Sequence, residues 1–217
     1  MSDARFTGTV QIDGQLTLNT ASIGNDHLLT AAAIARSKLA VDSLQQFGID
    51  LNSLRTHDNL SALLPGTPAT DDLGLVDGTF GTDAASIQTE DLDSAGLTTN
   101  RARFLFAIPA EYAAGQTLNL RLHAGMLTNI ADATATVDVE VYKSDEEGAV
   151  GSDLCTTAAT TINSLVLSDK DFTITPTGFS AGDLLDVRIS TAVNDAATGA
   201  AVKAIIGAIK MLVDIQG

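Results

Sequence analysis

The residues that could perform catalysis or bind a metal are few and scattered. The chain has three histidines, His27, His57 and His123, and one cysteine, Cys155. No histidine stands at metal-ligand spacing from a second histidine or from the cysteine, so the sequence predicts no metal site. The chain also lacks Gly-x-Ser-x-Gly, a phosphate-binding loop and a dinucleotide fingerprint. We therefore expect no catalytic residue, no cofactor and no enzymatic activity, with Cys155 a small buried apolar side chain and His123 a polar residue on a strand face.

Carboxylates are numerous, but they gather in segments expected to be loops. The clusters are Asp71-Asp72, residues 90–93 and residues 145–147. Such oxygens could hold calcium, yet the spacing of an EF-hand is missing, and we interpret the clusters as solvated turns. A glycosidase-type carboxylate pair stays open, because its members can come from distant strands. The absence of tryptophan nevertheless removes the usual platform for stacking a sugar.

Composition narrows the classes of partner. The 217 residues include 12 Lys and Arg against 27 Asp and Glu, a formal charge of −15, which disfavours direct binding to nucleic acid or anionic lipid. Hydrophobic residues make up 45% and aromatic residues 4% of the chain, so a core must be built from Val, Ile, Leu and Ala. Neither a secretion signal nor an apolar run of about 20 residues is visible, and we expect no membrane span and assembly in a cytosol.

Alternation of apolar and polar residues predicts a jelly-roll-like β-sandwich in the second part of the chain. The predicted strands cover residues 102–109, 117–124, 134–143, 171–175, 183–191 and 202–215, with weaker candidates at 86–90 and 157–166. The last strand carries apolar residues at both odd and even positions, such as Ile205 and Ile209 on one face and Ile206 and Leu212 on the other. We expect both faces to be covered, by the chain's own arm or by a neighbouring copy.

The first 64 residues are expected to form an arm for assembly. Residues 7–18 alternate around Asp13-Gly14, which indicates a hairpin, and a narrow apolar stripe after Asp26 has partly helical spacing. The stripe is too thin for a separate core, although an ordinary helix packed on its own domain remains the alternative. We predict an arm at 1–64, a linker at 65–84 and the sandwich at 85–217. The expected interface residues are Val10, Leu16, Leu18, Ile34, Leu39, Val41, Leu44 and Phe47.

Three segments resemble virion structural proteins of tailed bacteriophages, of the capsid decoration (cement) and head-fibre type. They are FLFAIPAEYAAGQTLNLRLHAG at 104–125, FSAGDLLDVRIST at 179–191 and AAAIARSKLAVDSL at 31–44. The resemblance covers about two thirds of the chain through generic motifs, namely Gly-Asp turns and alternating strands. It implies a virion protein, usually a homotrimer, with the major capsid protein as partner, and it carries over no catalytic residue.

Two functions follow as hypotheses. The first is a decoration protein on the outer capsid surface, assembled in the host cytoplasm, which stabilises the shell. The alternative is a tail-fibre or host-recognition module of a phage that binds glycans, which would need exposed aromatic rings. Tyr112, Tyr142 and a few phenylalanines are the rings available for that role. An enzyme built on a β-sandwich is a third, less favoured hypothesis.

Overall fold

The computed structural model describes residues 43–69, 71–144, 151–196 and 200–216, which form two antiparallel β-sheets packed face to face. The described elements are β1 (Ser43–Gly48), η2 (Leu51–Ser53), β2 (Gly74–Val76), β3 (Ser86–Gln88), β4 (Gly96–Ala107), β5 (Leu118–Met126), β6 (Thr134–Ser144), β7 (Thr160–Thr161), β8 (Ser168–Ile174), β9 (Leu184–Asp195) and β10 (Ala204–Ile215). No helix in these ranges is long and apolar enough to cross a membrane.

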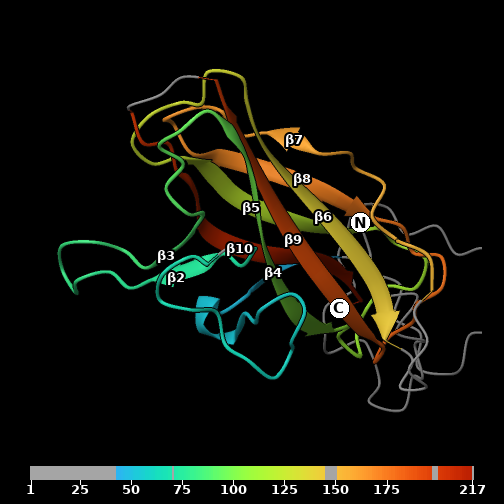
Figure 1. Cartoon of the computed structure of the whole chain (residues 1–217). Coiled ribbons are helices and arrows are strands. Elements are labelled where there is room, and N and C mark those ends of the chain that lie inside the picture. The colour runs from blue at the N-terminus through green and yellow to red at the C-terminus, as the bar shows by residue number, and fades with distance from the viewer. Residues whose placement is uncertain (1–42, 70, 145–150, 197–199, 217) are drawn as a thin grey trace, which may run out of the picture.

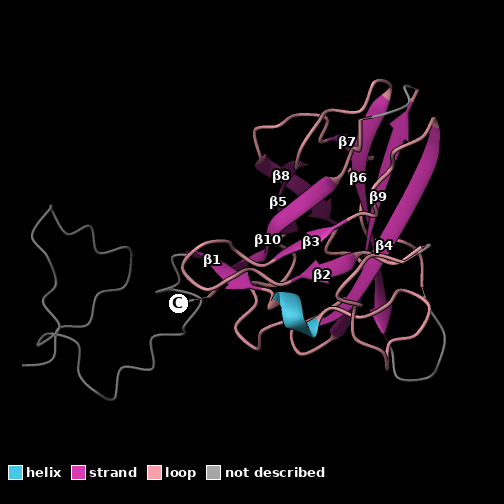
Figure 2. Ribbon diagram, turned by 60° about the vertical axis from the view of Figure 1, so that its left-hand side comes forward, coloured by secondary structure: helices cyan, strands magenta, loops and turns pink. Residues whose placement is uncertain are grey.

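The strand order brings together segments that are far apart in the sequence. Sheet A has the order β2-β3-β10-β5-β8, and β1 also pairs with β10. Sheet B has the order β4-β9-β6-β7. Figure 1 labels the strands, and Figure 2 shows β4, β9 and β6 on one side with β5, β8 and β10 on the other. Every pairing between named strands is antiparallel, so the predicted β-sandwich is confirmed.

The core lies between the sheets and is mainly aliphatic. Strand β9 alternates strictly between buried and partly exposed positions, as do most of β4, β5 and β6. Successive strand residues point to opposite faces, so each strand supplies one apolar row to the core and one polar row to solvent. Phe104 from sheet B and Phe172 from sheet A add the largest fully buried side chains.

The last strand differs from the sequence prediction because its register shifts. A bulge lies between Ile206 and Ala208, where β10 pairs with β5. An extra residue reverses the direction of the side chains that follow it. Ile206 before the bulge and Ile209 after it are therefore both buried, while Lys210 is exposed. One strand thus delivers most of its apolar residues to one core. The expectation that both faces are covered holds at residues 211–213, which are all buried. It was wrong earlier in the strand, where Ile205 and Ala208 are partly exposed.

The sandwich begins before residue 85. Strand β1 pairs with β10 along its whole length, and the ring of Phe47 lies 6.1 Å from that of Phe106 in sheet B. Leu54, Leu64 and Leu73 are buried in the same core. Residues 43–64, expected in an arm, and residues 73–76, expected in a linker, therefore pair with or pack on the sandwich. The predicted hairpin and the start of the helical stripe lie outside the described residues, and residues 43–48 are strand.

Candidate functional site

A polar hollow lies on the outer face of sheet B, where β4, β9 and β6 run side by side. It has a volume of about 210 Å³ and is lined by His57, Arg103, Tyr142, Asp186 and Arg188. We call it the sheet B groove. Its members come from three strands and from the segment that precedes β2, and the pairing of β9 with both β4 and β6 brings them together.

His57 lines one side of the groove and belongs to a segment, residues 51–69 and 71–73, that we call the groove wall. The backbones of Arg55 and Arg103 exchange two hydrogen bonds, of 2.8 and 2.9 Å. Further along, the Arg101 N–H donates to the Asp71 carbonyl at 2.7 Å, and the Leu73 N–H donates to the Arg101 carbonyl at 2.8 Å. The segment therefore extends sheet B beyond its β4 edge. Leu54 and Leu73 anchor this groove wall in the core, since each is 1% exposed.

Two arginine–carboxylate pairs form the floor of the groove. Arg103 donates to Asp186 from Nε at 2.6 Å and also from Nη2. Arg188 donates to Glu140 from Nε at 2.5 Å and also from a terminal nitrogen. The hydrogen bond to Asp186 raises the pKa of Arg103 further above its usual range. Each guanidinium is therefore charged and held in a fixed orientation, with its charge balanced by a neighbouring carboxylate.

Tyr142 supplies the aromatic ring of the groove. It lies opposite Asp186 in the β6–β9 pairing, and its hydroxyl is 3.4 Å from a Glu140 oxygen. Loss of solvation, followed by the negative charge of Glu140, raises the pKa of Tyr142. The hydroxyl thus stays protonated at neutral pH and can donate a hydrogen bond, while the ring offers a flat apolar surface beside the charged pairs.

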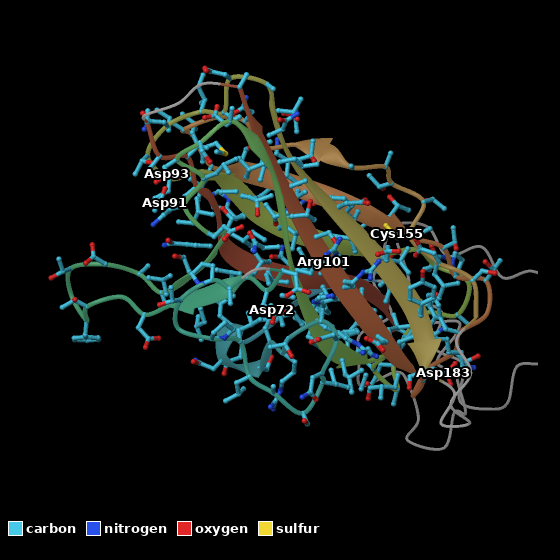
Figure 3. The ribbon with its side chains drawn as sticks, in the orientation of Figure 1. Asp72, Asp91, Asp93, Arg101, Cys155 and Asp183 are labelled. Atoms are coloured by element: carbon cyan, nitrogen blue, oxygen red, sulfur yellow. The ribbon has the colours of Figure 1, made fainter. Side chains whose placement is uncertain are left out.

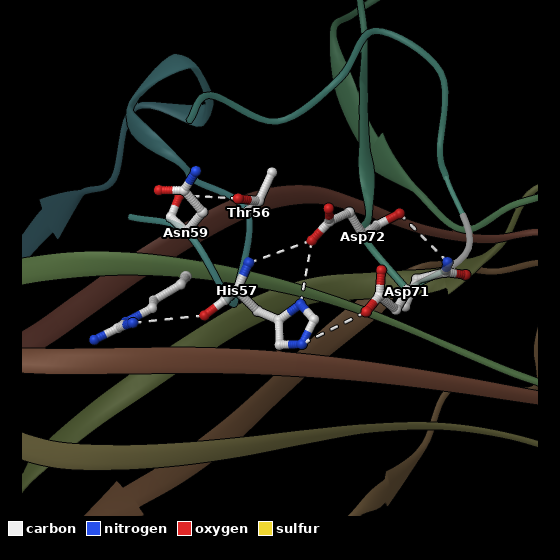
Figure 4. Close-up of polar contacts among 7 residues, drawn as sticks. Thr56, His57, Asn59, Asp71 and Asp72 are labelled. Atoms are coloured by element: carbon white, nitrogen blue, oxygen red, sulfur yellow. Dashed lines mark hydrogen bonds and ion pairs between the residues drawn. The ribbon is translucent and has the colours of Figure 1, made fainter. Parts of the chain in front are cut away.

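His57 lies between two carboxylates where the groove wall meets β4 (Figure 4). Its Nδ1 is 3.2 Å from Asp72 Oδ1, and its Nε2 is 3.8 Å from Asp71 Oδ2. Asn100 is fully buried in β4 and donates to the Asp72 carbonyl at 3.3 Å, which fixes the position of that residue. Because this cluster holds one imidazole and two carboxylates, it is the group among the described residues that could hold a metal ion.

The outer face of sheet A is also charged, but its hollow is smaller. Arg121 there forms a bidentate pair with Asp171, with both hydrogen bonds at 2.7 Å. His123 Nδ1 lies 2.8 Å from Asp169 Oδ1, so this histidine is the polar strand-face residue that the alternation predicted. The hollow beside these residues measures about 100 Å³, and its lining includes no tyrosine or phenylalanine. These pairs resemble those of sheet B without the wall or the tyrosine.

Among the residues predicted as an interface, Leu44 and Phe47 are described, and neither lines the sheet B groove. Val10, Leu16, Leu18, Ile34, Leu39 and Val41 lie outside the described residues. Leu44 is 55% exposed on β1, whereas Phe47 packs on the core of its own sandwich. Figure 3 places Cys155 and Asp183 well away from Asp72. Burial raises the pKa of the Cys155 thiol to about 11, so the group stays protonated at neutral pH.

Several of the loop carboxylates form hydrogen bonds or ion pairs that the sequence did not predict. Asp91 lies 3.2 Å from the Lys203 ammonium, Asp72 is bound to His57, and Glu90 accepts from Thr98. Residues 145–147 lie outside the described part of the chain. The strand residues of the groove are recognisable in the sequence as polar positions of alternating strands. The sequence does not show which strands are neighbours, so it could not predict that these residues meet.

Comparison with known proteins identifies no family for this chain. No protein-family description and no curated protein matches it. Among solved structures, a xylan-binding module, CBM15, is 12% identical with a TM-score of 0.42, over 81% of this chain and 100% of that one. The family 30 carbohydrate-binding module of a Clostridium thermocellum cellulosomal cellulase is 11% identical with a TM-score of 0.33, over 77% of this chain and 96% of that one. Both likenesses are distant, so we use only the chain's own geometry below.

Proposed function

We propose that the protein is a non-catalytic module that binds a neutral glycan in the sheet B groove. The observation that carries this proposal is a walled hollow in which two charge-balanced arginine–carboxylate pairs lie beside one tyrosine ring. This is the glycan-binding alternative of the two sequence hypotheses, now assigned to a specific face of the sandwich.

The balance of charge indicates a neutral ligand. Arg103 is paired with Asp186 and Arg188 with Glu140, so the floor offers no unpaired cation for a phosphate or a sulfate. The chain as a whole carries a formal charge of −15, which repels polyanions. A ligand that binds here must form hydrogen bonds with both the arginine donors and the carboxylate acceptors, and it must itself be uncharged.

Sugar hydroxyls fit this requirement because each one both donates and accepts. Guanidinium N–H groups and carboxylate oxygens that lie next to each other can bond to two vicinal hydroxyls at once. The ring of Tyr142 can cover the apolar C–H face of a pyranose. Rigid side chains also reduce the ordering cost of binding, and all four charged side chains of the floor are already held by their partners.

Retention in gels that contain soluble polysaccharides tests the proposal. The full chain is run through gels with xylan, β-glucan, mannan or galactan, and we expect at least one to slow its migration. Tyr142→Ala and Arg188→Gln should remove most of that retardation. The matched control is Arg121→Gln, which breaks a similar pair on sheet A and should migrate like the wild type in every gel. Retardation that is lost in the sheet A variant instead would refute the assignment.

A second candidate, self-assembly as in the virion hypothesis, is favoured by one residue. Phe80 is fully exposed in the loop that connects β2 and β3, which extends away from the sandwich in Figure 1. A fully exposed aromatic ring gains free energy when a second copy covers it. Light scattering after size exclusion tests this candidate: a wild-type trimer that Phe80→Ser dissociates would support it, and a monomer in both cases would contradict it. Capsid decoration itself stays a prediction.

A further inference from the structure

The cluster of His57, Asp71 and Asp72 brings one ligand atom of each side chain within 4.8 Å of the other two. Asp72 Oδ1 accepts from the His57 backbone N–H at 3.2 Å and lies at the same distance from His57 Nδ1. A carboxylate oxygen accepts hydrogen bonds, so the imidazole must carry its proton on Nδ1 to make this contact. When the ring binds a ligand in this orientation, Nε2 is then the nitrogen that offers its lone pair.

That lone pair faces a second acceptor. Nε2 lies 3.8 Å from Asp71 Oδ2, a distance too long for an N–H···O hydrogen bond. Two acceptors that face each other repel unless a cation lies between them. A divalent ion with bonds of about 2.0–2.2 Å to a histidine nitrogen and to a carboxylate oxygen spans a gap of this size.

The charges around the cluster favour a bound cation. Within the described residues, the ion pairs of Asp71 and Asp72 are those with His57. The nearby Arg103 donates to the His57 carbonyl at 3.5 Å, but its guanidinium is paired with Asp186. The ion pairs of these two carboxylates among the described residues therefore involve one imidazole, and no lysine or arginine is paired with either of them.

We propose that His57 Nε2 and the Asp71 carboxylate bind a divalent transition-metal ion of the zinc class. One imidazole with carboxylates is a donor set typical of zinc, whereas calcium prefers oxygen ligands throughout. Asp71 is half-exposed, so water can complete the coordination. Asp72 acts as the positioning residue: it holds Nδ1–H and turns Nε2 toward the ion, as carboxylates do for histidine ligands of metals. This inference does not depend on glycan binding.

Isothermal titration of the chelator-treated full chain with zinc chloride tests the site. We expect a zinc event that His57→Gln and Asp71→Asn remove, that Asp72→Asn weakens about 10- to 100-fold, and that calcium and magnesium do not reproduce. The matched control is His123→Gln, because the His123–Asp169 pair has a similar Nδ1 contact without a second carboxylate opposite Nε2 among the described residues. Circular dichroism checks that each variant is folded.

Three results would overturn the proposal: no zinc uptake by the wild type, unchanged uptake by His57→Gln, or equal loss in His123→Gln. In the first case the hydrogen bonds between His57 and Asp72 account for the cluster without an ion. The polysaccharide gels are run with chelator present, so that the two proposals can fail separately. Retention in the gels without zinc uptake would refute the metal site and leave the glycan proposal standing. Zinc uptake without retention would refute the glycan proposal and leave the metal site standing.

Discussion

Replacing Leu54 by alanine tests whether the groove wall is anchored in the core. The side chain is 1% exposed and belongs to the same cluster as Phe104 and Phe106. Truncating a fully buried leucine removes its transfer free energy and leaves a cavity, at a cost of about 3–5 kcal/mol. A domain is typically stable by about 5–15 kcal/mol, so this loss is a large part of the total. For a chain of this size it should lower the melting temperature by roughly 6 °C or more.

Leu63→Ala provides the matched control, since Leu63 belongs to the same groove wall and is 58% exposed. An exposed truncation of this kind usually changes stability by less than about 0.5–1 kcal/mol. Urea unfolding followed by circular dichroism measures both variants. If Leu54→Ala were no more destabilising than Leu63→Ala, residues 51–73 would not be held by the core, and the wall of the proposed groove would lose its support.

Three further predictions concern the boundary, one carboxyl and the thiol. Deleting residues 1–64 should abolish cooperative urea unfolding, because the deletion removes β1, Leu54 and Leu64 from the core. If residues 85–217 formed a separate domain, that domain would still unfold cooperatively. Asp183→Asn should cost less than about 1 kcal/mol at pH 7. Hydrogen bonds from Lys143 and from the Ser180 N–H hold the pKa of this carboxyl below its usual value. The stabilisation by ionised Asp183 is therefore complete above the unfolded pKa of about 3.9 and is lost as the pH falls through the folded pKa. Equal effects of the substitution at pH 7 and pH 2.5 would contradict this prediction. Cys155 should react with iodoacetamide at pH 8 at least about tenfold more slowly in the native chain than in urea, because burial raises the pKa of its thiol.

The sandwich could be predicted from the sequence because its long strands alternate. Every second residue is buried throughout β9 and over most of β4, β5 and β6, and that period is visible without any structure. Strand β1 was missed because its apolar residues, Leu44 and Phe47, are three apart, a spacing that favours a helix. Its strand conformation is imposed by pairing with β10, a partner more than 150 residues away.

The terminal strand was misinterpreted for a related reason. Alternation was counted through Gly207 as if the strand were regular, whereas the bulge changes the parity at that point. The same limit applies to the groove. Arg103, Arg188 and Glu140 were recognisable as outward positions, but only the order β4-β9-β6 places them side by side. His57 and Asp72 meet because two backbone bridges hold the groove wall against β4, and no local pattern in the sequence marks such bridges.

Mapping of the ligand by nuclear magnetic resonance tests the central claim most directly. The polysaccharide that retards the protein best is hydrolysed to an oligosaccharide and titrated into isotopically labelled full chain in the presence of chelator. We expect the amide shifts that change to cluster in β4, β6 and β9 and in the groove wall, around Arg103, Tyr142 and Arg188. Changes confined to β5, β8 and β10, or no change at millimolar sugar for any polysaccharide tested, would contradict a glycan site in the sheet B groove.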